Sequence, residues 1–195
     1  AGGKALIVID TGSDVNALAF FMDPATGAPR LACASGKKVH VFDPVAGGEA
    51  LVVIDVGSSA ESLVVFTDPA TGAPRIACGD REGKIHIFDV VAGGKALVVL
   101  EGHTEWVNHL KVFTDPATGE TRLVSGSRDS TARVWNPAAG GAAIEAEPQG
   151  HSQKVEALVT FVDPATGALR VATGSDDIRV WEVETGGGLL VIGVG

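Results

Sequence analysis

Short apolar runs alternate with turn-forming residues along the whole chain. Residues 93–139 show this pattern most clearly: runs of four to seven residues, rich in β-branched and aromatic types, are bounded by Gly, Pro, Asp or Ser. Such runs are typical of β-strands, and no segment of ten or more residues keeps a helical period without Gly or Pro. The expected strands of this unit are Leu97–Leu100, Val107–Phe113, Arg122–Ser127 and Thr131–Trp135.

Two sequence markers recur with a period of about 46 residues. A Gly-Gly pair followed by an apolar run begins at Gly2, Gly47, Gly93, Gly140 and Gly186. The string Asp-Pro-Ala-Thr-Gly begins at Asp23, Asp68, Asp115 and Asp163. Because independent markers give one period, the chain is a tandem repeat. We expect a single domain over residues 1–195, with repeats at about 2–46, 47–92, 93–139 and 140–185 and an extra terminal strand at 186–195.

Each Asp-Pro-Ala-Thr-Gly string predicts a tight hairpin turn. Proline fixes the backbone of the second position, the Asp carboxylate accepts the following amides, and Gly closes the turn in a left-handed conformation. A similar turn is expected at 43–47 and at 136–140. Successive hairpins give a four-stranded antiparallel meander, and because one meander cannot cover its own faces, neighbouring repeats must stack.

The third and fourth units carry an ordered set of residues that resembles a known repeat family. The third unit has Gly102-His103, Ser125-Gly126-Ser127, Arg128-Asp129 and Trp135-Asn136. The fourth unit has Gly150-His151, Thr173-Gly174-Ser175, Asp177 and Trp181-Glu182. In this order and at this period, the set resembles the WD-repeat (WD40) family of β-propellers, and the resemblance covers all four units. It implies an all-β propeller with four four-stranded antiparallel blades.

The number of strands bears on how the propeller closes. The chain has five copies of the strand after the Gly-Gly turn and four of every other strand. WD-repeat propellers usually close with about seven blades, and closure is what removes exposed strand edges. We therefore expect these blades to be part of a larger or oligomeric propeller. An internal segment of a longer propeller is the favoured interpretation, and self-pairing of two copies or a closed four-blade ring are the alternatives.

The resemblance also implies a buried hydrogen-bond chain from Trp through a hydroxyl and His to Asp. Its members are His103, Ser125, Asp129 and Trp135 in the third unit and His151, Thr173, Asp177 and Trp181 in the fourth. Ser, His and Asp together could also be a catalytic triad, but a hydroxyl capped by Trp and a set that recurs favour a structural role. Units one and two have Cys33 and Cys78 at the hydroxyl position, Phe42 and Phe88 at the Trp position and no equivalent His. We expect apolar packing in place of the polar chain there.

No cofactor or metal site is expected. His40 and His86 occupy a position that holds Arg in the other units, and neither has further ligands nearby in the sequence. One carboxylate in each Asp-Pro-Ala-Thr-Gly turn falls far short of what calcium requires. The two cysteines fall at equivalent strand positions on neighbouring blades and are expected to be small core residues, too far apart for a disulfide.

Charge and hydropathy limit the class of partner. Asp and Glu number 24 against 15 Lys and Arg, and the net charge of −9 disfavours nucleic acid. No apolar run has the roughly 18 to 20 residues that a membrane helix needs, and the first residues lack the layout of a signal peptide. A cytoplasmic or nuclear location is the default expectation.

WD-repeat proteins often bind partners on the face that carries the loops into the second strand and the turns after the third. By this resemblance the candidate partner-binding residues are Ser59, Glu61, Arg81, Trp106, Asn108, Arg128, Lys154, Glu156 and Asp176. Trp106 is either a binding hot spot or a cover for the loop beneath it. The expected function is a non-catalytic protein–protein interaction scaffold, a subunit or domain of a larger assembly. The alternative is a self-assembling structural repeat, and third comes an enzyme with a channel active site, for which no set of residues is apparent.

Overall fold

A computed structural model describes residues 3–116, 118–143, 145–146, 151–183 and 189–192. Gly2, Gly150 and Gly186 lie outside these residues, as does the expected terminal strand apart from 189–192. The described residues form β-strands joined by turns and loops, which confirms the expected all-β class. None of them belongs to a helix long and apolar enough to cross a membrane.

The strands form four sheets, each a four-stranded antiparallel meander, which we call blades 1 to 4. Blade 1 contains β1 (Val15–Met22), β2 (Pro29–Ser35), β3 (Lys38–Phe42) and β4 (Val52–Asp55). Blade 2 contains β5 (Ala60–Thr67), β6 (Pro74–Asp80), β7 (Lys84–Asp89) and β8 (Val98–Glu101). Blade 3 contains β9 (Val107–Thr114), β10 (Thr121–Ser127), β11 (Ala132–Trp135) and β12 (Glu145–Ala146). Blade 4 contains β13 (Ala157–Val162), β14 (Leu169–Gly174), β15 (Ile178–Val183) and β16 (Leu189–Ile192).

The sheets are offset by one strand from the sequence repeats. β4 follows the Gly-Gly turn that opens the second repeat, yet it pairs with β3 of the first, with Val39 opposite Ile54. The same holds for β8, β12 and β16, each of which pairs with the strand before its own Gly-Gly turn. Every blade therefore takes its outermost strand from the sequence that follows it.

This offset explains a difference from the sequence-based expectation at the start of the chain. We expected a strand after the first Gly-Gly pair, but residues 3–14 form none. The side chains of Leu6 and Val8 are 101% and 84% exposed there. A strand of this type pairs with the third strand of the preceding blade, and the described chain offers no such partner to residues 3–14. The prediction of a strand after the first Gly-Gly pair was wrong, because an apolar run needs a hydrogen-bonded partner to become a strand.

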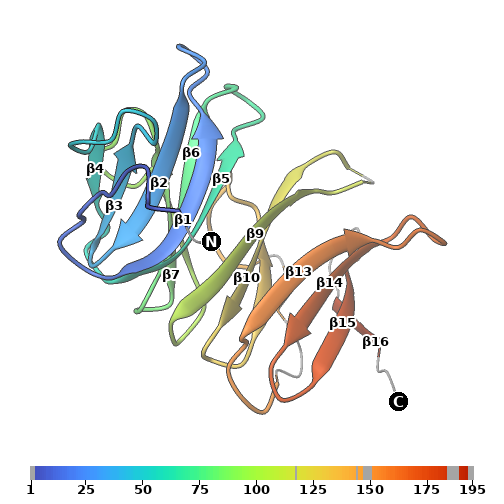
Figure 1. Cartoon of the computed structure of the whole chain (residues 1–195). Helices are drawn as coiled ribbons and strands as arrows, with labels where there is room; N and C mark the ends of the chain where they lie inside the picture. The colour runs from blue at the N-terminus through green and yellow to red at the C-terminus, as the bar shows by residue number, and fades with distance from the viewer. Residues whose placement is uncertain (1–2, 117, 144, 147–150, 184–188, 193–195) are drawn as a thin grey trace.

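The four blades stand in an open arc (Figure 1). The innermost strands β1, β5, β9 and β13 lie next to one another in that order, and blades 1 and 4 lie at opposite ends. This arrangement is that of blades in a propeller rather than of a closed four-blade ring.

Each seam between neighbouring blades has its own apolar core. Alternate side chains of a strand point to opposite faces, so that each of the two internal blades serves two seams. The seam of blades 1 and 2 buries Ala32, Val39, Ile54, Ile76 and Phe88. The seam of blades 2 and 3 buries Ile85, Leu100, Val107, Leu123 and Trp135. The seam of blades 3 and 4 buries Phe113, Val124, Val134, Val171 and Trp181.

The hairpin turns have the predicted chemistry. The Asp23 carboxylate accepts the Ala25 amide at 2.9 Å, and the Gly27 amide donates to the Asp23 carbonyl at 2.7 Å. Gly27 has a φ of 67°, the left-handed conformation that Gly adopts without strain. The amide bonds from Ala25 and Thr26 and the Thr26 hydroxyl lower the pKa of Asp23. The turns at Asp68 and Asp163 repeat the carboxylate–amide bond.

Candidate interaction surface

Trp106 is the residue directly before β9, in the loop that leads into the innermost strand of blade 3. Its backbone carbonyl accepts the Arg128 amide at 2.9 Å, which ties the loop before β9 to the turn after β10. Two guanidinium groups cover its ring: Arg81 of blade 2 lies 4.0 Å from the ring centroid and Arg128 lies 3.7 Å from it. Cation–π contacts of this kind hold a large aromatic surface half-buried between two blades.

Acidic and hydroxyl groups fix one of these arginines. Arg81 Nε donates to Glu61 Oε1 at 2.5 Å, and the Ser59 hydroxyl donates to the same oxygen at 3.1 Å. The Arg81 amide also donates to the Ser59 carbonyl at 3.1 Å. Five of the nine candidate residues, Ser59, Glu61, Arg81, Trp106 and Arg128, therefore form one contiguous cluster, which we call the Trp106 cluster.

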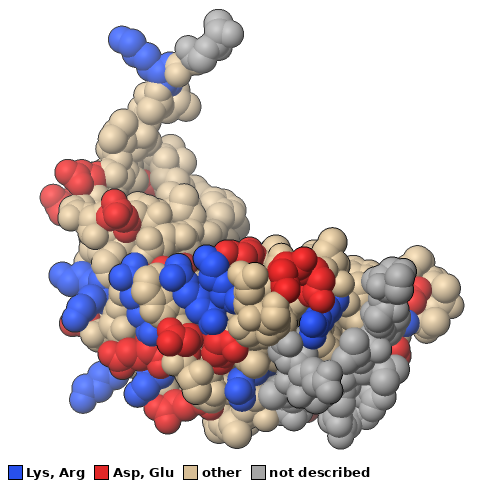
Figure 2. All heavy atoms as spheres, turned by 90° about the horizontal axis from the view of Figure 1, so that it is seen from below, with Lys and Arg blue, Asp and Glu red and all other residues tan. Residues whose placement is uncertain are grey.

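The other four candidate residues lie on the same rim but outside this cluster. In blade 4, Lys154 Nζ pairs with Glu156 Oε1 at 2.6 Å, and this contact lowers the pKa of Glu156. Asp176 accepts a hydrogen bond from the Ser152 hydroxyl, and Asn108 is half-buried on β9. Figure 2 views this side of the molecule from below and shows acidic and basic side chains interspersed rather than sorted into single-sign patches.

The residues of the expected polar chain in blade 3 are in mutual contact. Trp135 Nε1 donates to Ser125 Oγ at 2.8 Å, and His103 Nε2 lies 2.7 Å from the same oxygen. His103 Nδ1 lies 2.7 Å from Asp129 Oδ2. The Thr131 hydroxyl adds a bond to Asp129 at 2.6 Å, a contact that sequence reasoning did not include.

Burial and hydrogen bonding set the protonation states of His103 and Asp129. Burial lowers the pKa of His103, so that the ring is neutral and its Nδ1–H donates to Asp129. Burial alone would raise the pKa of Asp129, but its hydrogen bonds with His103, Thr131 and the Thr104 amide hold that pKa well below the usual range. The Ser125 hydroxyl is fully buried and capped by Trp135. A substrate cannot reach it, so this Ser-His-Asp set lacks the exposed nucleophile of a catalytic triad.

Blade 4 repeats the arrangement. Trp181 Nε1 donates to Thr173 Oγ1 at 2.8 Å, and His151 Nε2 lies 2.8 Å from that hydroxyl. His151 Nδ1 lies 2.5 Å from Asp177 Oδ1. The turn before β15 is two residues shorter than its equivalent in blade 3, and the register of the strand pair is kept.

Blades 1 and 2 bury Cys or Phe at the positions of the polar chain and make polar contacts at other positions. In blade 2 the Asp80 carboxylate, 1% exposed, lies 2.9 Å from His86 Nε2 and accepts the amides of Glu82 and Lys84. In blade 1 the Ser35 hydroxyl contacts Thr11 Oγ1 at 3.1 Å. The Asp80–His86 pair lies outside the positions of the polar chain, since Asp80 corresponds to Ser127 of blade 3 and His86 to Arg133.

Cys33 and Cys78 are both buried and unpaired. Burial raises the pKa of each thiol, which keeps both protonated and unreactive. Each therefore behaves as a small core residue at the position that Ser125 and Thr173 fill in blades 3 and 4.

Sequence reasoning missed a repeated arginine at the opposite end of the blades. Each unit has Arg seven residues after the first Asp of the Asp-Pro-Ala-Thr-Gly string, namely Arg30, Arg75, Arg122 and Arg170. Arg75 lies 3.4 Å from Asp68 and 2.7 Å from Asp89, so that it joins the two hairpin turns of its blade. The constant spacing is the sequence signal that could have identified it. We call this contact the arginine clamp.

The clamp is complete in three blades. Arg30 pairs with Asp23 and Asp43 at 3.4 and 3.6 Å, and Arg170 pairs with Asp163 and Glu182 at 3.1 and 3.0 Å. In blade 3 the second acidic position is Asn136. Arg122 Nη2 pairs with Glu120 there, and Arg122 Nη1 is buried without a hydrogen-bond partner.

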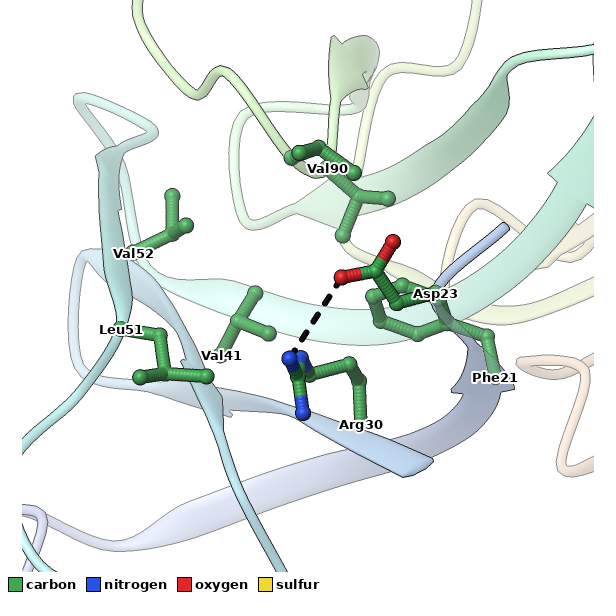
Figure 3. Close-up of a pocket in the computed structure, with 8 residues that line it drawn as sticks. Phe21, Asp23, Arg30, Val41, Leu51, Val52 and Val90 are labelled. Atoms are coloured by element: carbon green, nitrogen blue, oxygen red, sulfur yellow. Dashed lines mark hydrogen bonds and ion pairs between the residues drawn. The ribbon is translucent and has the colours of Figure 1, made fainter. Parts of the chain in front are cut away.

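A pocket of about 230 Å³ lies beside the clamp of blade 1. Figure 3 shows Arg30 reaching Asp23 within a wall of apolar side chains that includes Phe21, Val41 and Val90. Because the charged groups of this pocket neutralise each other, it offers no unpaired polar group to orient a ligand.

One group of potential metal ligands occurs among the described residues: His151, Asp176 and Asp177, whose ligand atoms lie within 4.8 Å of one another. Both ring nitrogens of His151 already contact Asp177 and Thr173. A metal ion would have to break the polar chain of blade 4, so this group does not fit a metal site.

The comparison with protein families gives one match. The WD40 model, described as WD domain, G-beta repeat, matches residues 94–136. This match extends from the Gly-Gly turn that opens the third unit to Asn136, and it includes the whole polar chain of blade 3. No curated protein sequence matches the chain closely enough to name a relative.

Solved structures similar to this one agree on the fold. The computationally designed Ika4 protein has a TM-score of 0.69 and 23% identity, over 94% of this chain and 100% of that chain. A chain of an active polycomb repressive complex 2 in the basal state has a TM-score of 0.70 and 20% identity, over 93% of this chain and 40% of that one. A chain of Chaetomium thermophilum Polycomb Repressive Complex 2 bound to GSK126 has a TM-score of 0.71 and 21% identity, over 94% and 42%. At these identities the likeness shows the fold alone, and this chain spans less than half of the two polycomb chains.

Proposed function

Because the chain carries a WD40 repeat at residues 94–136 and folds into blades of the WD40 propeller type, we propose that it is a non-catalytic scaffold for protein–protein interactions. The similarity to chains of polycomb repressive complex 2, a multi-subunit assembly by its name, supports a role as a subunit of a larger assembly. The net charge of −9 favours protein over nucleic acid as the partner. The two unpaired cysteines support a cytoplasmic or nuclear location.

We place the partner on the Trp106 cluster, and one observation carries this choice. The Trp106 ring lies under the guanidinium groups of Arg81 and Arg128, at 4.0 and 3.7 Å, on a rim shared by two blades. Trp and Arg are the side chains most often responsible for binding energy at protein interfaces. Arg128 is exposed, so its remaining donors suit a carboxylate on the partner, and the indole suits an apolar side chain beside it.

The test compares proteins captured by the immobilised wild-type chain with those captured by Trp106→Ala. For each partner that the wild type captures, we expect Trp106→Ala to weaken binding by about 2 kcal/mol, which calorimetry measures as a change in Kd. Thr26→Lys and Thr71→Lys, in exposed turns at the opposite end of the blades, are the matched controls and should leave Kd unchanged. Binding that survives Trp106→Ala and fails in the turn variants would place the partner on the other face.

A further inference from the structure

The outer face of blade 1 exposes side chains that are packed in the other blades. Leu18 and Phe20 of β1 are 58% and 61% exposed. Their equivalents in blade 2, Leu63 and Val65, point toward blade 1 and pack into the first seam. In every internal seam this position contacts the preceding blade, so blade 1 presents the surface that accepts a preceding blade.

The outer face of blade 4 is the counterpart. Phe161 of β13 is 42% exposed, whereas its equivalents Phe21, Phe66 and Phe113 are 8%, 8% and 9% exposed because the following blade covers them. Val159, on the same face, is 52% exposed. Blade 4 therefore presents the surface that accepts a following blade.

A size match within the internal seams shows which residues meet there. A Cβ atom at Gly79 of blade 2 would lie 2.7 Å from Val107 Cγ1 of blade 3, and one at Gly126 of blade 3 would lie 2.7 Å from Val155 Cγ1 of blade 4. Glycine on one blade thus makes room for valine on the next. At the first seam the corresponding residues are alanine on both sides, Ala34 and Ala60, and both are fully buried.

The two open faces of this chain carry the same pair of residue types, glycine on one face and valine on the other. Blade 4 has Gly174 at the glycine position, and among the described residues other than its chain neighbours only Ala157 lies within 4 Å of a Cβ built there, at 3.4 Å. Blade 1 has Val15 at the valine position, and this side chain is 48% exposed. An open hollow at one end of the arc therefore corresponds to an uncovered valine at the other.

The outer edge of blade 1 keeps a further seam contact. In the internal seams a Cβ at Gly93 would lie 3.0 Å from Val52, and one at Gly140 would lie 3.1 Å from Val98, both on the outermost strand of the preceding blade. At Gly47 of blade 1 the corresponding distance is 2.9 Å, to Ile7. Residues around Ile7 thus fill the place that the outermost strand of a preceding blade takes in the internal seams, and a second copy whose β16 takes that place must displace them.

We propose that a second copy of this chain covers both faces. Blade 4 of each copy packs against blade 1 of the other, with Val15 of one copy seated at Gly174 of its partner, and the two arcs close into an eight-blade ring. Head-to-tail contacts of this kind form a closed assembly when the rotation permits, and eight blades lie within the range of known propellers. The inference uses faces remote from the Trp106 cluster and does not depend on it.

Light scattering coupled to size-exclusion chromatography tests the proposal through the solution mass. The wild-type chain should elute at twice its monomer mass of 19.8 kDa. Phe20→Asp disables one face and Val159→Asp disables the other, so each variant alone should be a monomer. An equimolar mixture of the two variants retains one intact pair of faces and should form a 1:1 complex. Val99→Asp, at an exposed apolar residue on β8 of the internal blade 2, should remain a dimer.

The size match gives a sharper test. Gly174→Ala should crowd Val15 of the partner and raise the dissociation constant by at least about tenfold. Adding Val15→Ala should restore association, because Ala opposite Ala is the pair that the first seam already buries. Thermal melting of each monomer checks that the variants are folded. A wild-type chain that stays monomeric, assemblies larger than a dimer, or monomeric mixtures of the two face variants would each overturn the proposal.

Discussion

At the scale of single side chains, His103 joins a buried hydroxyl to a carboxylate in blade 3. Its two nitrogens contact Ser125 and Asp129 at 2.7 Å each, and it is buried inside blade 3. We expect His103→Ala to lower the free energy of unfolding by about 2 to 4 kcal/mol, because it leaves a cavity and removes one hydrogen bond each from the Ser125 hydroxyl and the Asp129 carboxylate. Thr11→Ala in blade 1 is the contrast and should cost far less, since Ser35 keeps its bond to the Ser13 carbonyl. Urea denaturation measures both, and equal losses would contradict the structural role of His103.

The same histidine predicts how stability changes with pH. Burial lowers the pKa of His103 below its unfolded value of about 6.5, so the unfolded chain takes up a proton first as the pH falls. The stabilisation is complete above that unfolded pKa and declines as the pH drops toward the folded one. We expect the urea concentration at the unfolding midpoint to decrease as the pH is lowered from 7.5 to 5. The decrease should be smaller in His103→Gln. Identical slopes would show that His103 does not titrate with unfolding.

At the scale of elements, the arginine clamp is complete in three blades and lacks one carboxylate in blade 3. Arg122 Nη1 is buried without a hydrogen-bond partner, while the equivalent Arg75 bonds Asp89 at 2.7 Å. We expect Asn136→Asp to raise the free energy of unfolding by about 1 kcal/mol, since the second oxygen would accept from Arg122. The reverse change in blade 2, Asp89→Asn, should lower it by a similar amount. Chemical denaturation measures both, and no gain in N136D would mean that Arg122 is satisfied in another way.

The strand after the Gly-Gly turn shows how a sequence pattern depends on its neighbours. Residues 6–10 read Leu-Ile-Val-Ile-Asp and residues 51–55 read Leu-Val-Val-Ile-Asp, yet only the second run forms a strand, β4. We expect the amides of residues 6–10 to exchange with solvent much faster than those of β4, because β4 alone has a hydrogen-bonded partner. Hydrogen exchange read by mass spectrometry compares the two peptides directly, using a chain variant held monomeric by Phe20→Asp. Equal protection would mean that residues 6–10 pair in solution.

At the scale of the whole molecule, the period and the turn chemistry were enough to predict four antiparallel meanders. Strands such as β9 and β10 fall within one residue of their expected bounds, because Gly, Pro and Asp act locally. The Asp80–His86 pair and the clamp of Arg30 were not predicted, since both depend on which side chains the register brings together. The Trp106 cluster joins two blades, and only the stacking of blade 2 on blade 3 places Arg81 over that ring.

The offset between repeats and sheets has a consequence for a chain that has been cut. A protease that cleaved the turn between β3 and β4 would leave β4 covalently part of the downstream fragment but hydrogen-bonded to the upstream one, with Lys38 opposite Asp55 and Val41 opposite Val52. The same would hold between β7 and β8. The two fragments would thus stay hydrogen-bonded through this strand. A cleaved molecule should migrate as one particle until a denaturant separates the fragments.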